Sequence, residues 1–211
     1  MICYTAIFGK YDNLKTPTVV TEGWKYVCFT NNKELKSDFW DIRYIENKNL
    51  SNVKAARCIK IRFFDYVKDD LSIWCDASTQ INVDLNEFVK VYHRGNFTTT
   101  QHPVRNCVYQ EAYACMKLNK DNNEVIHKQM LGYFNEKMPQ HFGMIQSGLM
   151  IRNRDKEVIA FCTEWFKEVK KHSCRDQLSF NYVLWKTKLI KPYLITGDIF
   201  KNEFKLYRHT S

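Results

Sequence analysis

The segment Leu71-Ser-Ile-Trp-Cys-Asp-Ala-Ser78 decides the fold. Leu71–Cys75 is an apolar run of strand length that ends at an acidic residue, which predicts a buried strand followed by a turn. Ligands of open α/β sheets bind at the carboxyl ends of strands. A carboxylate there, such as Asp76 with the nearby oxygen of Ser78, can hold a hard cation. Asp76 could instead only cap a turn, and the spacing alone slightly favours that simpler interpretation.

Strand and helix patterns alternate on both sides of this segment. Short β-rich runs predict further strands over Ile2–Phe8, Lys25–Thr30, Trp40–Ile45, Phe97–Thr100, Met144–Ile151 and Leu189–Ile195. Apolar residues three and four apart predict helices over Asn52–Val67, Asp84–His93, Val104–Leu118, Asp121–Lys137, Asp155–Lys171 and Arg175–Trp185. This alternation is typical of an α/β sandwich with a largely parallel sheet, and the uninterrupted pattern favours one domain over residues 1–211.

The composition limits the classes of partner that this chain can bind. The 211 residues carry 32 Lys+Arg against 23 Asp+Glu, and this net charge of +9 indicates an anionic partner: nucleic acid, a membrane surface or a phosphorylated small molecule. No nucleic-acid module, dinucleotide fingerprint or phosphate-binding Walker loop is present, so we expect no nucleic-acid partner. The apolar runs are shorter than the ~18 residues of a membrane span, and the N-terminus has no signal-peptide pattern. We therefore expect a cytoplasmic protein whose eight cysteines are buried free thiols.

A basic ridge lies on the predicted helix before the Asp76 strand. Lys54, Arg57 and Lys60 recur every three residues. Positive side chains close to a carboxylate that holds a metal would suit a diphosphate. The more common alternative for such a run is a solvated basic helix face.

Asp176 and Gln177 lie at the start of a predicted helix. A helix N-terminus favours carboxylates and ligand oxygens, which makes both residues candidates for a binding site. Ser173 and Asp176 could instead form a capping box without chemistry, and the local spacing leaves both interpretations open.

Two further regions contain ionisable residues of the kinds that chemistry uses. His102, Arg105 and Glu111 surround a strand-to-helix turn, where His102 could bind a ligand, carry a proton or be purely structural. His209, close to the C-terminus, is either a tail residue or a metal ligand.

Together these segments resemble the glycosyltransferase-like family catalogued as domain of unknown function 616. The strings that carry the resemblance span nearly the whole chain: Tyr4-Thr-Ala-Ile-Phe-Gly-Lys-Tyr-Asp12, Cys28-Phe-Thr-Asn31, Ala55-Ala-Arg-Cys-Ile-Lys60, Ser72-Ile-Trp-Cys-Asp-Ala-Ser78, His102-Pro-Val-Arg105, Ser147-Gly-Leu-Met-Ile-Arg152 and Arg175-Asp-Gln-Leu-Ser-Phe180. The chain is more distantly similar to retaining glycosyltransferases of the galactosyltransferase and glycogenin type.

The resemblance implies a GT-A-like, Rossmann-like three-layer fold and a transferase that uses a nucleoside-diphosphate sugar, with UDP as the expected nucleotide, and Mn²⁺ or Mg²⁺. Implied roles are base, ribose and diphosphate binding by Thr5, Tyr11, Asp12, Arg57 and Lys60, metal binding by Asp76, Ser78 and His209, sugar or acceptor binding by Arg105, Glu111, Ser147, Gly148 and Arg175, and catalysis by Asp176, Gln177 and His102. Ser78 stands where the distant relatives have a second aspartate, which removes one charge from the metal site. Retention at the anomeric carbon is expected by analogy.

The acceptor and the location are the least determined features. We expect a glycan or lipid-linked acceptor, with peripheral contact to the inner face of a membrane through the basic last quarter of the chain. Two other functions stay open: a metal-dependent lipid amide hydrolase of the ceramidase kind, and a non-catalytic basic module that binds anions or glycans.

Overall fold

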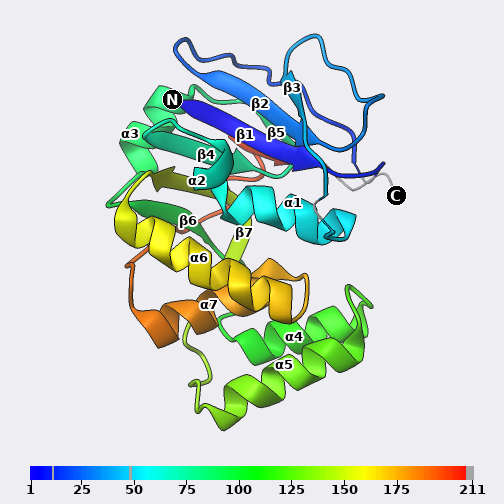
Figure 1. Ribbon diagram of the computed structural model, residues 1–211. Helices are drawn as coiled ribbons and strands as arrows, with labels where there is room; N and C mark the ends of the chain where they lie inside the picture. Colours follow the sequence, from blue (N-terminus) through cyan, green and yellow to red (C-terminus); the bar gives the residue numbers. More distant parts are fainter. Residues whose placement is uncertain (11, 48, 208–211) are drawn as a thin grey trace.

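A seven-stranded mixed sheet organises the computed structural model, which describes residues 1–10, 12–47 and 49–207 (Figure 1). The strand order is β3-β2-β1-β4-β7-β6-β8. The strands span Ile2–Ile7 (β1), Lys25–Thr30 (β2), Asp41–Tyr44 (β3), Leu71–Cys75 (β4), Phe97–Gln101 (β6), Ile145–Asn153 (β7) and Tyr193–Ile195 (β8). The four strands β1 to β4 are parallel to one another, and β6 is parallel to β8, while β7 is antiparallel to both β4 and β6. The expected mainly parallel α/β sheet is confirmed.

Helices and loops cover both faces of this sheet. The helices span Asn52–Ile61 (α1), Phe63–Tyr66 (α2), Leu85–Tyr92 (α3), Val108–Lys117 (α4), Asn123–Asn135 (α5), Lys156–Lys171 (α6) and Asp176–Thr187 (α7). In β1, Ile2 and Tyr4 belong to one apolar cluster, with α1, α6 and α7, while Cys3 and Ile7 belong to another, with α3. Alternate side chains of a strand point to opposite faces, so these two clusters are the two sides of a three-layer domain. α4 and α5 form a helical pair beyond α7 (Figure 1).

Several elements differ from the sequence-based prediction, and β8 spans only Tyr193–Ile195 of the strand expected over Leu189–Ile195. The helix expected over 52–67 is interrupted at Arg62, which ends α1 and precedes the short α2. α4 begins at Val108 instead of Val104, because the Nδ1 atom of His102 accepts the backbone N–H groups of Val104 and Arg105 and so forms a turn. A separate two-stranded sheet of β5 (Thr79–Ile81) and β9 (Phe204–Leu206) was not predicted. Strands of three residues are too short to give a periodic signal.

The cysteine prediction agrees with the structure. All eight cysteines are free, and six of them are buried. In the part of the chain that the structure describes, no helix is long and apolar enough to cross a membrane.

Candidate active site

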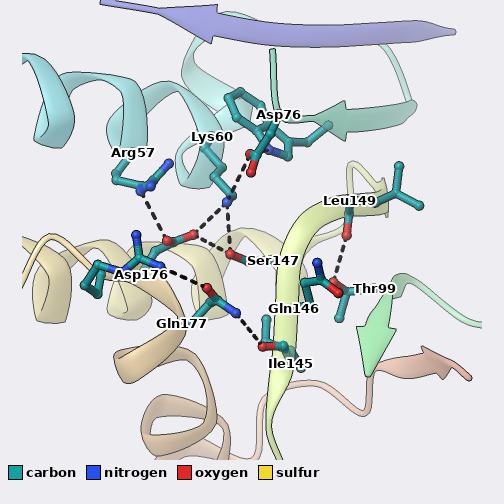
Figure 2. A network of polar contacts seen from close by, with 12 residues as sticks. Arg57, Lys60, Asp76, Thr99, Ile145, Gln146, Ser147, Leu149, Asp176 and Gln177 are labelled. Atoms are coloured by element: carbon teal, nitrogen blue, oxygen red, sulfur yellow. Dashed lines mark hydrogen bonds and ion pairs between the residues drawn. The ribbon is translucent and has the colours of Figure 1, made fainter. Parts of the chain in front are cut away.

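The candidate site lies at the carboxyl end of β4. Because β7 runs antiparallel, its early residues Ser147 and Gly148 lie beside that end, and the N–H of Asp76 donates to the carbonyl of Gly148 at 3.0 Å. α1 contributes Arg57 and Lys60 from one side. α7 contributes Asp176 from the other, and Figure 2 shows these side chains converging. Residues far apart in the sequence therefore form one polar network.

Asp176 is the centre of this network. Its carboxylate is 2% exposed and lies 3.1 Å from Arg57 Nε and 2.8 Å from Lys60 Nζ, and it accepts a hydrogen bond from Ser147 Oγ at 2.8 Å. Burial by itself would raise the pKa of Asp176, but the charges of Arg57 and Lys60 outweigh it and hold that pKa well below its usual range. Asp176 is thus ionised at neutral pH and is a weak base.

Lys60 is buried and connects the two acidic residues of the site. Its ammonium is 1% exposed, donates to Ser147 Oγ at 3.0 Å and lies 3.5 Å from Asp76 Oδ1. The alternative of a solvated basic face is therefore wrong for Lys60. Lys54, in contrast, points away from the site, where its ammonium donates to the carbonyls of Lys170 and His172 at the end of α6.

Two residues that sequence reasoning missed hold the backbone of Lys60. The carbonyl of Lys60 accepts hydrogen bonds from Arg152 Nη1 at 2.8 Å and from the Tyr4 hydroxyl at 3.2 Å. Arg152 is fully buried, contacts the Tyr4 hydroxyl and lies 4.4 Å from the centre of the Phe63 ring. The available signal was an arginine directly after the apolar run that ends at Ile151. These contacts fix the point from which the Lys60 side chain extends.

Asp76 is the accessible carboxylate of the network. Its side chain is 34% exposed, and Oδ1 accepts the indole N–H of Trp74 at 2.9 Å. A methyl group built on Gly148 would lie 3.6 Å from Asp76 Oδ2 and 3.3 Å from the ring of Phe200. The hydroxyl of Ser78 is buried and has no hydrogen-bond partner among the described residues.

The start of α7 is not a capping box. Arg175 occupies the N-cap position without a side-chain cap, and the hydroxyl of Ser173 donates to Asp121 at 2.7 Å. Gln177 Nε2 donates to the carbonyl of Ile145 at 2.9 Å, which anchors α7 to β7. The capping interpretation is therefore wrong, and Asp176 faces the site.

His102, Arg105 and Glu111 form a second cluster. His102 Nε2 lies 3.4 Å from Glu111 Oε2, and Arg105 Nε contacts the same oxygen. Burial would raise the pKa of Glu111, but hydrogen bonds from His102 and Arg105 lower it below the usual value. Gln101, just before the turn, pairs with Ile145, whose carbonyl holds Gln177. The second cluster is therefore adjacent to the first along β6 and β7.

The remaining predicted donor-binding residues lie in or beyond β1. Thr5 is buried within the strand, and its hydroxyl has no hydrogen-bond partner in the described part of the chain. Asp12 follows the strand and is partly exposed. Tyr11 and His209 lie outside the described residues. Their roles stay predictions.

The side chains around Asp76 offer few ligands to a divalent cation, which needs several oxygen atoms. No group of three His, Cys, Asp or Glu side chains within residues 1–10, 12–47 and 49–207 could hold a metal ion. Asp176 already pairs with two cations, and Asp76 Oδ1 faces the Lys60 ammonium. A metal ion at Asp76 would therefore meet a like charge a few ångströms away. The described residues do not fit a metal ion coordinated by the protein.

Comparison with solved structures finds proteins that share this fold. The chain has the fold of the bifunctional glycosyltransferase WbbM in its apo form, with 13% identity, 92% of this chain and 38% of that chain covered, and a TM-score of 0.51. The apo structure of mouse xyloside xylosyltransferase 1 aligns with 10% identity, 98% and 95% coverage, and a TM-score of 0.49. The likeness to the first of these structures therefore shows a shared fold.

The family follows from the sequence match. Residues 1–209 match the model of the TOD1/MUCI70, glycosyltransferase-like domain, and the chain belongs to this family. A relative from Arabidopsis thaliana described as "Probable hexosyltransferase MUCI70" is 24% identical over 217 residues. That alignment covers 87% of this chain and 37% of the relative, so the chain spans little more than a third of the relative's length.

Proposed function

We propose that this chain transfers a hexose from a nucleoside-diphosphate sugar, with UDP as the expected nucleotide, to a glycan or lipid-linked acceptor. The observation that carries the proposal is the buried Asp176 carboxylate held between Arg57 and Lys60, at the edge of the sheet where α/β folds bind ligands. Family membership and the printed name of the plant relative support the same class of reaction.

The cations of the network suit the leaving group of such a reaction. Bond cleavage at the anomeric carbon leaves negative charge on the departing diphosphate, and preorganised positive groups stabilise that charge. In this proposal Arg57 and Lys60 supply the positive field, and Asp176 holds both in place. The resemblance also implies Mn²⁺ or Mg²⁺, which we keep outside the proposal because the described donor set does not suit either ion.

Retention of configuration is part of the proposal. An inverting transferase needs a carboxylate that accepts the acceptor's proton. Asp176 and Glu111 lie beside positive groups that lower the pKa of each carboxylate. Paired carboxylates of this kind favour the retaining course that the distant resemblance implies. We also propose a cytoplasmic location and peripheral membrane contact through the basic last quarter of the chain.

A screen of nucleotide sugars tests the function. Purified protein is heated with UDP-, GDP- and ADP-hexoses, and a true donor raises the melting temperature because it binds only the folded state. The donor found is then incubated with glycan acceptors, and release of the nucleoside diphosphate is measured. Release of fatty acid from ceramide without any nucleotide would refute the proposal in favour of the hydrolase.

A further inference from the structure

The Lys60 ammonium lies between Asp76 and Asp176, the two acidic residues of the polar network. Nζ is 2.8 Å from Asp176 Oδ2 and 3.5 Å from Asp76 Oδ1. Figure 2 shows the ammonium between the two carboxylates. We propose that this ammonium takes the place of a divalent cation, so that a nucleoside diphosphate binds the site without a metal ion coordinated by the protein. The inference rests on the proposed function, because it concerns how the same donor is held.

The oxygen atoms near Asp76 support this assignment. A hard cation needs several oxygen ligands, and Asp76 Oδ1 is already shared between the Trp74 indole and Lys60. The surface next to Oδ2 is partly apolar, since a methyl group on Gly148 would lie 3.6 Å from Oδ2 and 3.3 Å from the Phe200 ring. An ammonium is satisfied by three hydrogen-bond acceptors, and Lys60 has Asp176, Ser147 and Asp76 around it.

Lys60 is also fixed in position, as a substitute for a bound ion has to be. Its carbonyl is held by Arg152 and Tyr4, and its ammonium lies 5.6 Å from the centre of the Trp74 ring. A buried charge is screened by salt much less than a surface charge. The position of this positive charge is therefore set by the fold.

Positive side chains around the network would attract an anion. Arg57, Lys60 and Arg175 all act on Asp176 and lower its pKa, against the opposing effect of burial. Three cations therefore gather around the two carboxylates Asp76 and Asp176. A diphosphate is the group in the proposed donor that these cations would attract.

Calorimetry on the full chain tests the proposal. UDP, GDP and ADP are titrated into the protein in EDTA and, separately, in MnCl₂. We expect the best nucleotide to bind with dissociation constants that agree within about threefold in the two buffers. Binding at least tenfold tighter in Mn²⁺ would overturn the inference and leave the proposed function intact. If no nucleoside diphosphate binds in either buffer, the proposed function fails, and the inference fails with it.

Two further measurements complement the comparison of the two buffers. Mn²⁺ alone, mixed with equimolar protein, is expected to keep the full electron paramagnetic resonance signal of the free ion, and its loss would overturn the inference. Lys60→Met is expected to weaken nucleotide binding in EDTA at least tenfold, with part of it recovered in Lys60→Arg. Lys54→Met removes the same charge from the same helix away from the site and is expected to bind within twofold of the original. Unchanged binding by Lys60→Met would overturn the inference. If Lys60→Met does not fold, the buffer comparison and the Mn²⁺ signal still decide.

Discussion

Asp176 Oδ2 lies 2.8 Å from Lys60 Nζ, and this pair joins the last helix of the domain to the first. Both side chains are almost completely buried. A buried ion pair depends on the presence of both partners, because removal of one leaves an uncompensated charge in the interior. Four predictions follow from this pair and its neighbours.

Asp176→Asn removes the anion but keeps the shape of the side chain. Arg57 and Lys60 then lack their shared counter-charge, and we expect the free energy of unfolding to fall by about 3–5 kcal/mol. Urea unfolding at neutral pH measures the loss. Asp198→Asn is the control, since Asp198 forms an exposed pair with Lys201 and should change stability by less than about 1 kcal/mol. Equal effects of the two substitutions would contradict the prediction.

Acid should weaken the fold through the same carboxylate. The pKa of Asp176 in the folded state lies well below its usual range, because Arg57 and Lys60 outweigh the opposing effect of burial. A group of this kind stabilises the protein above its unfolded-state pKa of about 3.9, and the stabilisation is lost as pH falls toward the folded-state value. We expect the free energy of unfolding to decrease below about pH 4, and less steeply in Asp176→Asn. Parallel slopes for the two proteins would refute this.

Tyr4→Phe removes a hydroxyl that donates to the carbonyl of Lys60 and contacts Arg152. The ring and its packing stay, so the loss reports on the hydrogen bonds. We expect a destabilisation of about 1–3 kcal/mol, as for other buried polar groups left without a partner, together with weaker nucleotide binding. Tyr207→Phe is the matched control, because the Tyr207 hydroxyl donates to Gln80 at a position that is only partly buried. If Tyr4→Phe binds nucleotide with unchanged affinity, the hydrogen bond from Tyr4 to the Lys60 carbonyl has no functional role.

Gly148→Ala would place a methyl group between Asp76 and Phe200. The contact of 3.3 Å with the Phe200 ring is tight, and we expect a loss of about 1–3 kcal/mol from overpacking. Phe200→Ala in the same chain should recover part of that loss, because the clash then disappears. A double-mutant cycle of unfolding free energies measures the coupling. Strictly additive effects would mean that the ring and the methyl group do not meet.

The sequence predicted the central sheet better than its edges. The runs that became β1, β2 and β4 were predicted within one residue, because buried strands are continuous apolar segments with clear ends. β5 and β9 were missed because they are held by pairing with each other, not by local pattern. The interruption at Arg62 was also missed, since the apolar spacing continues across it.

For the site, the sequence predicted which residues take part but not which residues they contact. Asp76, Ser147 and Asp176 could be chosen from the motifs around them, and the structure brings them together. Which cation each would meet could not be predicted, because a lysine at helical spacing gives no sign of whether its ammonium points inward. Lys54 and Lys60 belong to the same basic pattern in the sequence, but Lys54 donates to the end of α6 while Lys60 pairs with the buried Asp176.

The order of the network along the chain has a consequence for biosynthesis. Arg57, Lys60, Asp76 and Ser147 leave the ribosome before Asp176, which α7 supplies near the end of the domain. A nascent chain or a truncated fragment that ends before α7 carries Lys60 without its closest carboxylate. Closure of the site is therefore a late event, and no fragment from the first two thirds of the chain can complete the site.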